Sequence, residues 1–335
     1  MAKKIIFRGD GNPNTGLGHL FRLFALIEMF KEEYEYVLVT NTSTLLAAIP
    51  KKYNIDIIPK KVSILDEADW LAEHYPPKKH ILILDGYQFQ SNYQKKIKNH
   101  SYKLVYIDDL AHEYMYADYV VNHSPHATIE QYRSEHYTKF ALGTNYAILR
   151  PQFLKKPQAK REITIPSIAL VCLGGADKNN FTYKFVLELL NIPQIQKINV
   201  VVGAAYNFSN IFELENKNDK VKVYKNLDGE SLHTLMNTCN FAVAPTSTIL
   251  LELISVNMYL VSGYYVDNQK MAYHELAKRN VFEGIGNINT YKFNFLKTHL
   301  LNIKSPVIRA QIKSQHNLID GNQKCRFLDI MKNLS

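Results

Sequence analysis

His19 stands where a glycine-rich loop passes into an amphipathic segment, and it is the residue of this sequence best placed for proton transfer. The loop follows the short apolar run 5–7 and contains four glycines, at positions 9, 11, 16 and 18. After it, apolar residues recur with helical spacing, so the pattern changes from strand to helix inside the loop. Such a loop presents unpaired backbone N–H groups and the positive end of a helix dipole to an anion. A neutral imidazole there can accept a proton near pH 7.

Two common phosphate-binding loops are excluded by the residues themselves. No Gly-Lys-Ser or Gly-Lys-Thr follows the glycines, so the loop is not a P-loop. The Gly-x-Gly-x-x-Gly spacing of dinucleotide-binding proteins is also absent. Tight packing of a strand against a helix would explain the glycines equally well, and a histidine at a helix start is often an ordinary polar residue. The loop alone therefore leaves a ligand site and a packing role both open.

The composition is that of a globular protein with two domains. The chain has 335 residues, of which 46% are hydrophobic and 21% charged, and no apolar run reaches the about 20 residues of a membrane span. The first residues lead directly into a short strand, which predicts no secretory leader and no membrane insertion. Three widely spaced cysteines, Cys172, Cys239 and Cys325, indicate reduced thiols. A cytoplasmic location is expected.

The positive charge is concentrated in the second half of the chain. Residues 1–155 hold 19 Lys and Arg against 17 Asp and Glu, whereas residues 156–335 hold 21 against 14. The lysines are scattered and form no stripe with arginine and aromatic residues, so no nucleic-acid surface is expected. An anionic small molecule, or solubility alone, accounts for the excess.

Polar residues follow three apolar runs in the first half, at 80–85, 103–107 and 118–122. Such continuous apolar runs are typical of parallel strands covered on both faces. The carboxyl ends of parallel strands meet at one edge of a sheet, where ligands bind, so these polar ends should gather with His19. The residues concerned include Asp85, Asp108, Asp109 and His123. They could ligate a divalent ion, but strand-end aspartates more often cap helices or bind ligand hydroxyls, and no metal site is expected.

A polar, proline-containing stretch at 154–161 reads as a linker, and a second α/β alternation follows it. We therefore expect domains over residues 1–155 and 156–335, with a ligand in the cleft between them. Gly174 and Gly175 follow a strand, and Ser247 and Thr248 open a helix, which suits a diphosphate. Plain helix capping explains the two hydroxyl residues as well. Glu252, one turn later, could bind a ribose diol or be an ordinary helix carboxylate.

Taken in order, these stretches resemble the UDP-2,4-diacetamido-2,4,6-trideoxy-β-L-altropyranose hydrolases of pseudaminic acid biosynthesis. The residues Arg8-Gly9-Asp10 and Gly16-Leu17-Gly18-His19-Leu20-Phe21-Arg22 are similar to the N-terminal signature of that family. Further agreement lies in Leu84–Tyr87, Ile107–Asp109, Gly143–Arg150, Leu173–Asp177 and the residues Ser247, Thr248, Glu252 and Val266–Gln269. The resemblance covers roughly residues 3–330.

This resemblance implies two Rossmann-like domains with parallel sheets facing a cleft, a fold similar to glycosyltransferase-B enzymes, with helices at the C-terminus. It implies hydrolysis of a UDP-sugar at the anomeric carbon with inversion and with no cofactor. By position, His19 matches the general base, Asp10 belongs to the catalytic set, and Tyr87 and Asn268 line the sugar pocket. The positions matched to substrate or UDP binding are Gly16, Gly18, Arg22, Asp108, Gly174, Gly175, Asp177, Ser247, Thr248, Glu252 and Gln269.

Two departures from the family pattern put the exact sugar in question. The spacer Asn12-Pro13-Asn14-Thr15 is unusual, and Gln323 replaces the second glycine of a C-terminal Asp-Gly-x-Gly motif. Two other functions stay open. A glycosyltransferase on the same scaffold would use His19 to deprotonate an acceptor hydroxyl, and a non-catalytic protein would bind the nucleotide sugar without turnover. No basic, aromatic-rich amphipathic patch for a lipid-linked acceptor is evident, which favours the hydrolase.

Overall fold

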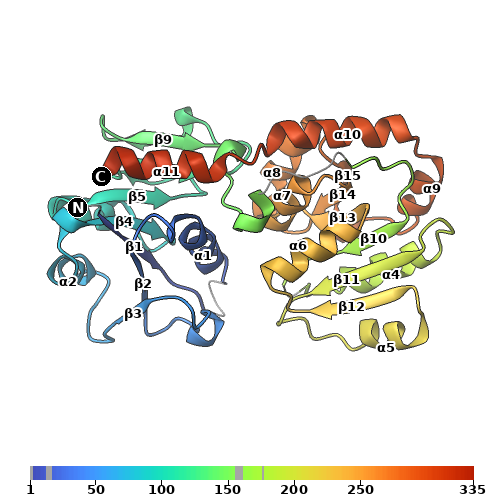
Figure 1. Ribbon diagram of the computed structural model, residues 1–335, viewed down its shortest axis with the longest axis horizontal. Helices are drawn as coiled ribbons and strands as arrows, with labels where there is room; N and C mark the ends of the chain where they lie inside the picture. The colour runs from blue at the N-terminus through green and yellow to red at the C-terminus, as the bar shows by residue number, and fades with distance from the viewer. Residues whose placement is uncertain (1–2, 13–16, 155–160, 176) are drawn as a thin grey trace. The chain divides into compact units, whose positions relative to one another are not determined.

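The computed structural model describes residues 3–12, 17–154, 161–175 and 177–335 and divides the chain into two compact units (Figure 1). The first unit comprises Met1–Pro151 together with Asn322–Ser335, and the second comprises Gln152–Gly321. Each unit is built on its own parallel β-sheet, as the apolar runs in the sequence predict.

The first unit has a seven-stranded parallel sheet in the order β3-β2-β1-β4-β5-β7-β9. Its strands are β1 (Lys4–Gly9), β2 (Tyr36–Asn41), β3 (Ile55–Ile58), β4 (His80–Asp85), β5 (Lys103–Ile107), β7 (Tyr119–Asn122) and β9 (Lys139–Leu142). A separate pair joins β6 (Tyr114–Met115) to β8 (Arg133–Ser134). The order reverses between β1 and β4, which is where ligands bind in open α/β sheets.

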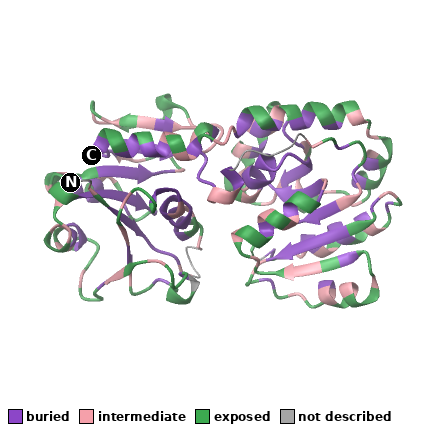
Figure 2. Ribbon diagram, in the orientation of Figure 1, coloured by how far each residue is buried: buried purple, intermediate pink, exposed green. Residues whose placement is uncertain are grey.

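Among the described residues of this unit, the α-helices that cover the sheet are α1 (Gly18–Phe30), α2 (Glu67–His74), α3 (Ser91–Asn99) and α11 (Gln323–Leu334). Alternate residues of each strand serve opposite faces. Ile6 and Leu82 therefore join a core with Leu71 of α2 and Ile97 of α3. Phe7 points the other way and stacks on Phe30 of α1, with ring centroids 6.2 Å apart. Burial on both faces explains why the central strands are continuous apolar runs (Figure 2).

The second unit has a six-stranded parallel sheet in the order β12-β11-β10-β13-β14-β15. Its strands are β10 (Ile168–Val171), β11 (Lys197–Val202), β12 (Val221–Lys225), β13 (Phe241–Pro245), β14 (Tyr259–Tyr264) and β15 (Glu283–Asn287). The helices are α4 (Phe181–Leu190), α5 (Asn210–Lys217), α6 (Gly229–Thr238), α7 (Thr248–Ser255), α8 (Asp267–Lys278), α9 (Phe295–Asn302) and α10 (Ser305–Leu318). Here the order reverses between β10 and β13, the strands that precede Gly174 and Ser247.

The C-terminal helix α11 is part of the first unit, although the sequence predicts that it belongs to the second. The sequence predicts that the whole of 156–335 forms the second domain, but α11 groups with the first unit. The Phe327 ring lies 6.4 Å from that of Phe30 and 6.1 Å from that of Tyr146, centroid to centroid. In addition, Lys3 Nζ donates to the Leu334 carbonyl at 2.8 Å. The apolar side of α11 thus completes the first core.

Candidate active site

Helix α1 brings His19 to the point where the strand order of the first sheet reverses. His19 is the second residue of α1 and is buried, next to the carboxyl ends of β1 and β4. Gly9 ends β1, and a Cβ there would lie 2.6 Å from Leu23 Cδ1 and 2.9 Å from the Asp85 carbonyl oxygen. Only glycine permits this close approach of strand and helix. The packing role that the sequence left open for the glycines therefore applies at Gly9, and it is this packing that positions His19.

Asp85, the last residue of β4, holds the imidazole of His19. The Asp85 Oδ1 atom lies 2.7 Å from His19 Nδ1, and the Asp85 side chain is fully buried. Arg22, one turn along α1, donates to both carboxylate oxygens of Asp85, from Nε at 2.9 Å and from Nη2 at 2.7 Å. A third Arg22 nitrogen, Nη1, donates to Asp109 Oδ2 at 3.0 Å. Burial opposes the charge of Arg22, but attraction by Asp85 and Asp109 outweighs it and raises its pKa.

The contacts of His19 assign its tautomer. An ionised carboxylate offers only lone pairs, so the short Nδ1–Oδ1 contact requires the proton on Nδ1. Arg22 Nη2 also lies 2.8 Å from Nδ1. Of its two N–H bonds, one donates to Asp85 Oδ1, and the nearly equal distances among Nη2, Oδ1 and Nδ1 leave the other pointing away from Nδ1. The lone pair of neutral His19 is therefore on Nε2, where it can accept a proton from a bound molecule. A buried carboxylate that orients an imidazole in this way also stabilises the imidazolium formed on proton transfer.

Tyr87 stands over His19 from the loop after β4. The two rings meet edge to face, with centroids 4.7 Å apart and planes at 89°. The Tyr87 hydroxyl donates to Asp109 Oδ2 at 3.3 Å, and 47% of the residue is exposed. Partial burial, reinforced by the negative charge of Asp109, raises the pKa of Tyr87. Tyr87 is thus a neutral, half-exposed phenol beside the His19 ring.

Asp10 has the contacts of a positioning residue. Its carboxylate accepts hydrogen bonds from Arg8 Nη1 at 2.6 Å, from the Asn41 backbone at 2.8 Å and from Gln88 Nε2 at 2.9 Å. Burial would raise the pKa of Asp10, but the Arg8 guanidinium lowers it further than burial raises it. The sequence places Asp10 in the catalytic set. In the structure it joins the loops after β1, β2 and β4, one of which carries Tyr87.

The side chain of Arg8, which pairs with Asp10, is fully buried. Arg8 pairs with both oxygens of Glu67 on α2, at 2.7 and 2.9 Å, and its guanidinium lies 5.0 Å from the centroid of the Phe89 ring. A buried cation is tolerated only when it is fully hydrogen-bonded, and Asp10 and Glu67 together meet this need. Arg8 thereby ties Asp10 to the core, and Asp10 in turn holds the loop after β4, which carries Tyr87, through Gln88.

The remaining predicted residues of the first unit divide in two. Asp108 holds the chain that follows β5, because its Oδ2 accepts hydrogen bonds from the Ala111 backbone and the Tyr132 hydroxyl, both at 2.8 Å. Gly18 opens α1 with free space beside its Cα, and Arg22 belongs to the His19 cluster. Gly16 lies outside the described residues.

In the second unit, the predicted residues lie after neighbouring strands at the carboxyl edge of the sheet. Gly174 has a φ of 96°, a conformation that favours glycine, and Gly175 follows it. Asp177 caps α4, because its two carboxylate oxygens accept the backbone N–H groups of Phe181 and Thr182 at 2.9 and 2.7 Å. These contacts satisfy the acid without a ligand.

The helices after β13 and β14 carry the other predicted residues. Ser247 precedes the first residue of α7, Thr248, and its hydroxyl makes no capping hydrogen bond. Glu252 is buried on α7. On α8, Asn268 is exposed, whereas Gln269 Oε1 accepts the Tyr265 backbone N–H at 3.2 Å. The capping alternative is therefore not observed for the Ser247 side chain.

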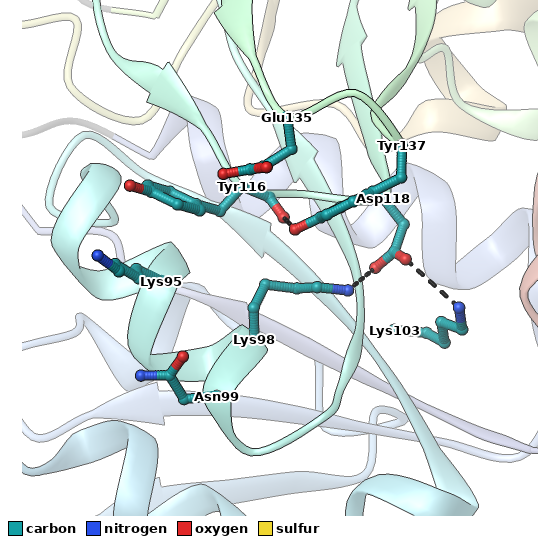
Figure 3. A pocket seen from close by; sticks show the side chains of 8 residues that line it. All are labelled: Lys95, Lys98, Asn99, Lys103, Tyr116, Asp118, Glu135 and Tyr137. Carbon is teal, nitrogen blue, oxygen red and sulfur yellow. Dashed lines mark hydrogen bonds and ion pairs between the residues drawn. The ribbon is translucent and has the colours of Figure 1, made fainter.

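A hollow of about 550 Å³ lies at the opposite edge of the first sheet (Figure 3). It lies near the amino ends of β5, β7 and β9, and Lys98 and Lys103 both pair with Asp118 within it. It contains no residue of the predicted site. Its lining is Lys95, Lys98, Asn99, Lys103, Tyr116, Asp118, Glu135 and Tyr137.

Sequence reasoning brings Asp85 and Asp109 to the edge of the sheet where the structure shows them, but it assigns them no role. The sequence signal that could have identified Asp85 and Asp109 as partners of His19 and Arg22 is their position at or just after the ends of buried strands, since an acid there lies close to the first helix. Among the described residues, no group of three or more His, Cys, Asp or Glu side chains is arranged to hold a metal ion. Within the same residues, no helix has the length and apolar character needed to span a bilayer.

Comparison with known proteins gives distant relatives. No protein-family model matches the chain. It is 22% identical over 280 residues to the UDP-2,4-diacetamido-2,4,6-trideoxy-beta-L-altropyranose hydrolase of Campylobacter jejuni, covering 82% of this chain and 97% of the relative. It is 22% identical over 340 residues to the spore coat polysaccharide biosynthesis protein SpsG of Bacillus subtilis, covering 97% and 96%. An uncharacterized protein of Methanocaldococcus jannaschii is 26% identical over 290 residues, which span 82% of this chain but 58% of that protein.

Solved structures of low sequence identity share the architecture. The calicheamicin glycosyltransferase CalG4 superposes with a TM-score of 0.68 at 10% identity, covering 100% of this chain and 98% of that one. MurG of Acinetobacter baumannii gives 0.63 at 13% identity over 99% of both chains. Anabaena HepE in complex with UDP gives 0.59 at 12% identity, over 98% and 100%. The chain therefore has the two-unit Rossmann-like fold of GT-B glycosyltransferases and is a distant relative of the Campylobacter and Bacillus proteins.

Proposed function

We propose that this chain is an enzyme acting on a UDP-linked sugar, and that it hydrolyses a UDP-linked 2,4-diacetamido-2,4,6-trideoxyhexose to UDP and the free sugar. The observation that carries the proposal is the His19–Asp85 pair, which leaves a proton-accepting nitrogen at the carboxyl edge of the first sheet. Support for the substrate comes from the name of the Campylobacter relative. This chain aligns with nearly the full length of that protein. The three cysteines, all within the described residues, form no disulfide, which suits the cytoplasm, where we place the reaction.

In the proposed reaction, a water molecule attacks the anomeric carbon. A bond forms between the water oxygen and that carbon, and the bond from the carbon to the β-phosphate oxygen breaks with its electron pair going to UDP. His19 Nε2 accepts the proton from the attacking water, and Asp85 stabilises the resulting imidazolium. Attack opposite the leaving group inverts the configuration. Tyr87, beside His19, would hydrogen-bond the sugar, together with Asn268.

We assign UDP binding to the second unit. The backbone N–H groups at Gly174, Gly175 and Thr248, together with the Ser247 hydroxyl, would stabilise the negative charge of the diphosphate, as helix N-termini and glycine turns do elsewhere. Glu252 would accept hydrogen bonds from the ribose hydroxyls. Gln269 would act indirectly, since its side chain supports the loop that precedes α8.

A second candidate is a glycosyltransferase that uses the same base. The observation in its favour is the fold, because CalG4 and MurG superpose over nearly the full chain. His19 would then take its proton from the hydroxyl of an acceptor sugar instead of from water. The two functions differ in whether UDP is released when no acceptor is present.

The deciding experiment measures UDP release from UDP-2,4-diacetamido-2,4,6-trideoxy-β-L-altrose without an acceptor and with EDTA. The wild-type chain should release UDP, and His19→Ala should lower turnover by at least ~10²-fold while leaving UDP affinity nearly unchanged. His112→Ala is the matched control, because that side chain is 54% exposed in the same unit. Binding of the UDP-sugar without release by the wild type would contradict hydrolysis. Equal turnover by His19→Ala would show that another group is the base.

A further inference from the structure

A second histidine lies at the same edge of the first sheet and has no part in the mechanism above. His123 directly follows β7, the neighbour of the strand that leads into Asp108 and Asp109. Its segment is held firmly. The preceding Asn122 side chain donates to the Tyr132 hydroxyl at 2.9 Å and accepts the Ser124 backbone N–H at 2.9 Å. The His123 ring therefore has a defined position at the carboxyl edge.

The contacts of His123 assign it the tautomer opposite to that of His19. His123 Nδ1 accepts the backbone N–H of Ile148 at 3.1 Å, so in the neutral ring the proton is on Nε2. Burial, followed by the positive charge of Arg22, lowers the pKa of His123 to about 4. At neutral pH the ring is an uncharged donor with its N–H at Nε2.

The Nε2–H group has no partner within the part of the chain that the structure describes. His123 as a residue is only partly buried, and its Nε2 is not among the fully buried side-chain atoms without a hydrogen-bond partner. Asp109 and His123 each lie two residues beyond Ile107 and Val121, which are register partners on the neighbouring strands β5 and β7. Arg22, Asp85 and Asp109, which lie around His19, also act electrostatically on His123. A donor that stays neutral suits an uncharged oxygen better than a phosphate.

We propose that His123 is a substrate-positioning residue whose Nε2–H donates a hydrogen bond to a hydroxyl or amide oxygen of the sugar. Naming the sugar as the partner rests on the proposed function. The two histidines then have different roles because they are different tautomers. His19 accepts a proton at Nε2, whereas His123 donates a hydrogen bond from Nε2–H without transferring the proton. His123 is not a second base, since its only acceptor nitrogen is taken by Ile148.

A pair of substitutions separates this role from a structural one. In His123→Gln the amide NH₂ group occupies approximately the place of Nε2–H, whereas in His123→Asn the amide oxygen occupies approximately that of Nδ1. We expect the Gln variant to keep kcat/KM within about threefold of wild type and the Asn variant to lose about tenfold, the usual effect of one neutral hydrogen bond. If His123 only supports the Ile148 backbone, the order is reversed. The reversed order, or equal activities, would overturn the proposal.

Affinity measurements test His123 even if the chain does not hydrolyse the sugar nucleotide. Titration calorimetry with UDP alone and with the UDP-sugar compares the two ligands in each variant. His123→Asn should lose affinity for the UDP-sugar and retain affinity for UDP, and His123→Gln should retain both. The same pattern without turnover by the wild type would reject hydrolysis and keep His123 as a sugar contact. An equal loss of UDP and UDP-sugar affinity in the Asn variant would overturn the proposal.

Discussion

With one negative charge, Asp85 serves two partners, His19 and Arg22. It orients His19, forms a two-point ion pair with Arg22, and lies fully buried at the end of β4. Removing the charge alone tests whether orientation of the imidazole depends on the carboxylate. The tautomer of His19 depends on the same charge, because an amide in this place can donate to Nδ1 and force the proton to Nε2.

We therefore predict that Asp85→Asn lowers kcat by at least ~10²-fold, since the lone pair needed for proton transfer would no longer be at Nε2. UDP affinity should stay within about threefold, because Asp85 lies outside the unit to which we assign UDP binding. Steady-state kinetics and calorimetry of the same preparation measure both quantities. A variant with full turnover would show that Asp85 does not control the tautomer of His19.

His123 also makes the stability of the first unit depend on pH. Its pKa is about 4 in the folded chain, against about 6.5 for an unfolded histidine. Between these values the unfolded chain binds more protons, so the free energy of unfolding decreases as the pH falls from 6.5 to 4, by up to about 1.4 kcal/mol for each unit of difference in pKa.

His123→Asn removes this contribution, so its free energy of unfolding should depend less steeply on pH over that range. Urea unfolding at several pH values, followed by the fluorescence of Trp70, measures the difference. Trp70 is the only tryptophan of the chain and lies in the first unit. The same dependence of the free energy of unfolding on pH in the wild type and in His123→Asn would contradict the prediction.

At the scale of single elements, Asp177 is a loop residue that stabilises the start of helix α4. It satisfies two N–H groups of the first turn of α4, so Asp177→Ala should destabilise the second unit by about 1 kcal/mol. Asp228→Ala is a matched control, because Asp228 caps α6 through the Ser231 N–H at 2.8 Å. Both variants should lose similar stability in urea and keep UDP affinity. Unchanged stability with tenfold weaker UDP binding would instead make Asp177 a ligand residue.

Strongly apolar elements could be predicted from the sequence, and sparsely apolar ones could not. The runs that form β4 and β5 are unambiguous, because both faces of each strand are buried. Helix α3 was not predicted, since Tyr93 and Ile97 are its only buried apolar residues among nine. Similarly, β15 contains two glycines and lies at a sheet edge. Such elements are stabilised by packing against the rest of the folded unit, so their own residues predict them poorly.

The candidate site could be predicted as a place but not as a set of contacts. The gathering of strand-end residues around His19 follows from parallel topology alone. The choice of Asp85 as its partner depends on register, which sets Gly9 opposite Asp85. Likewise, no local pattern distinguishes Asp10, saturated by hydrogen bonds, from an acid that is free to react.

At the scale of the whole molecule, the first unit is made of two separate stretches of chain. Phe327 of α11 is 3% exposed against the first core, so Phe327→Ala should shift the Trp70 unfolding transition by about 3–5 kcal/mol. Leu300→Ala, a buried change on α9 of the second unit, is the control and should leave that transition in place. An equal effect of both changes would contradict a separate first core.

The placement of α11 has a consequence during synthesis of the protein. Residues 322–335 are made only after the whole of 152–321, which takes on the order of ten seconds at ordinary translation rates. Throughout that time the ring of Phe30 lacks its partner Phe327. The first unit therefore emerges from the ribosome first but completes its core last, and its apolar face is exposed to chaperones and to neighbouring nascent chains until α11 arrives.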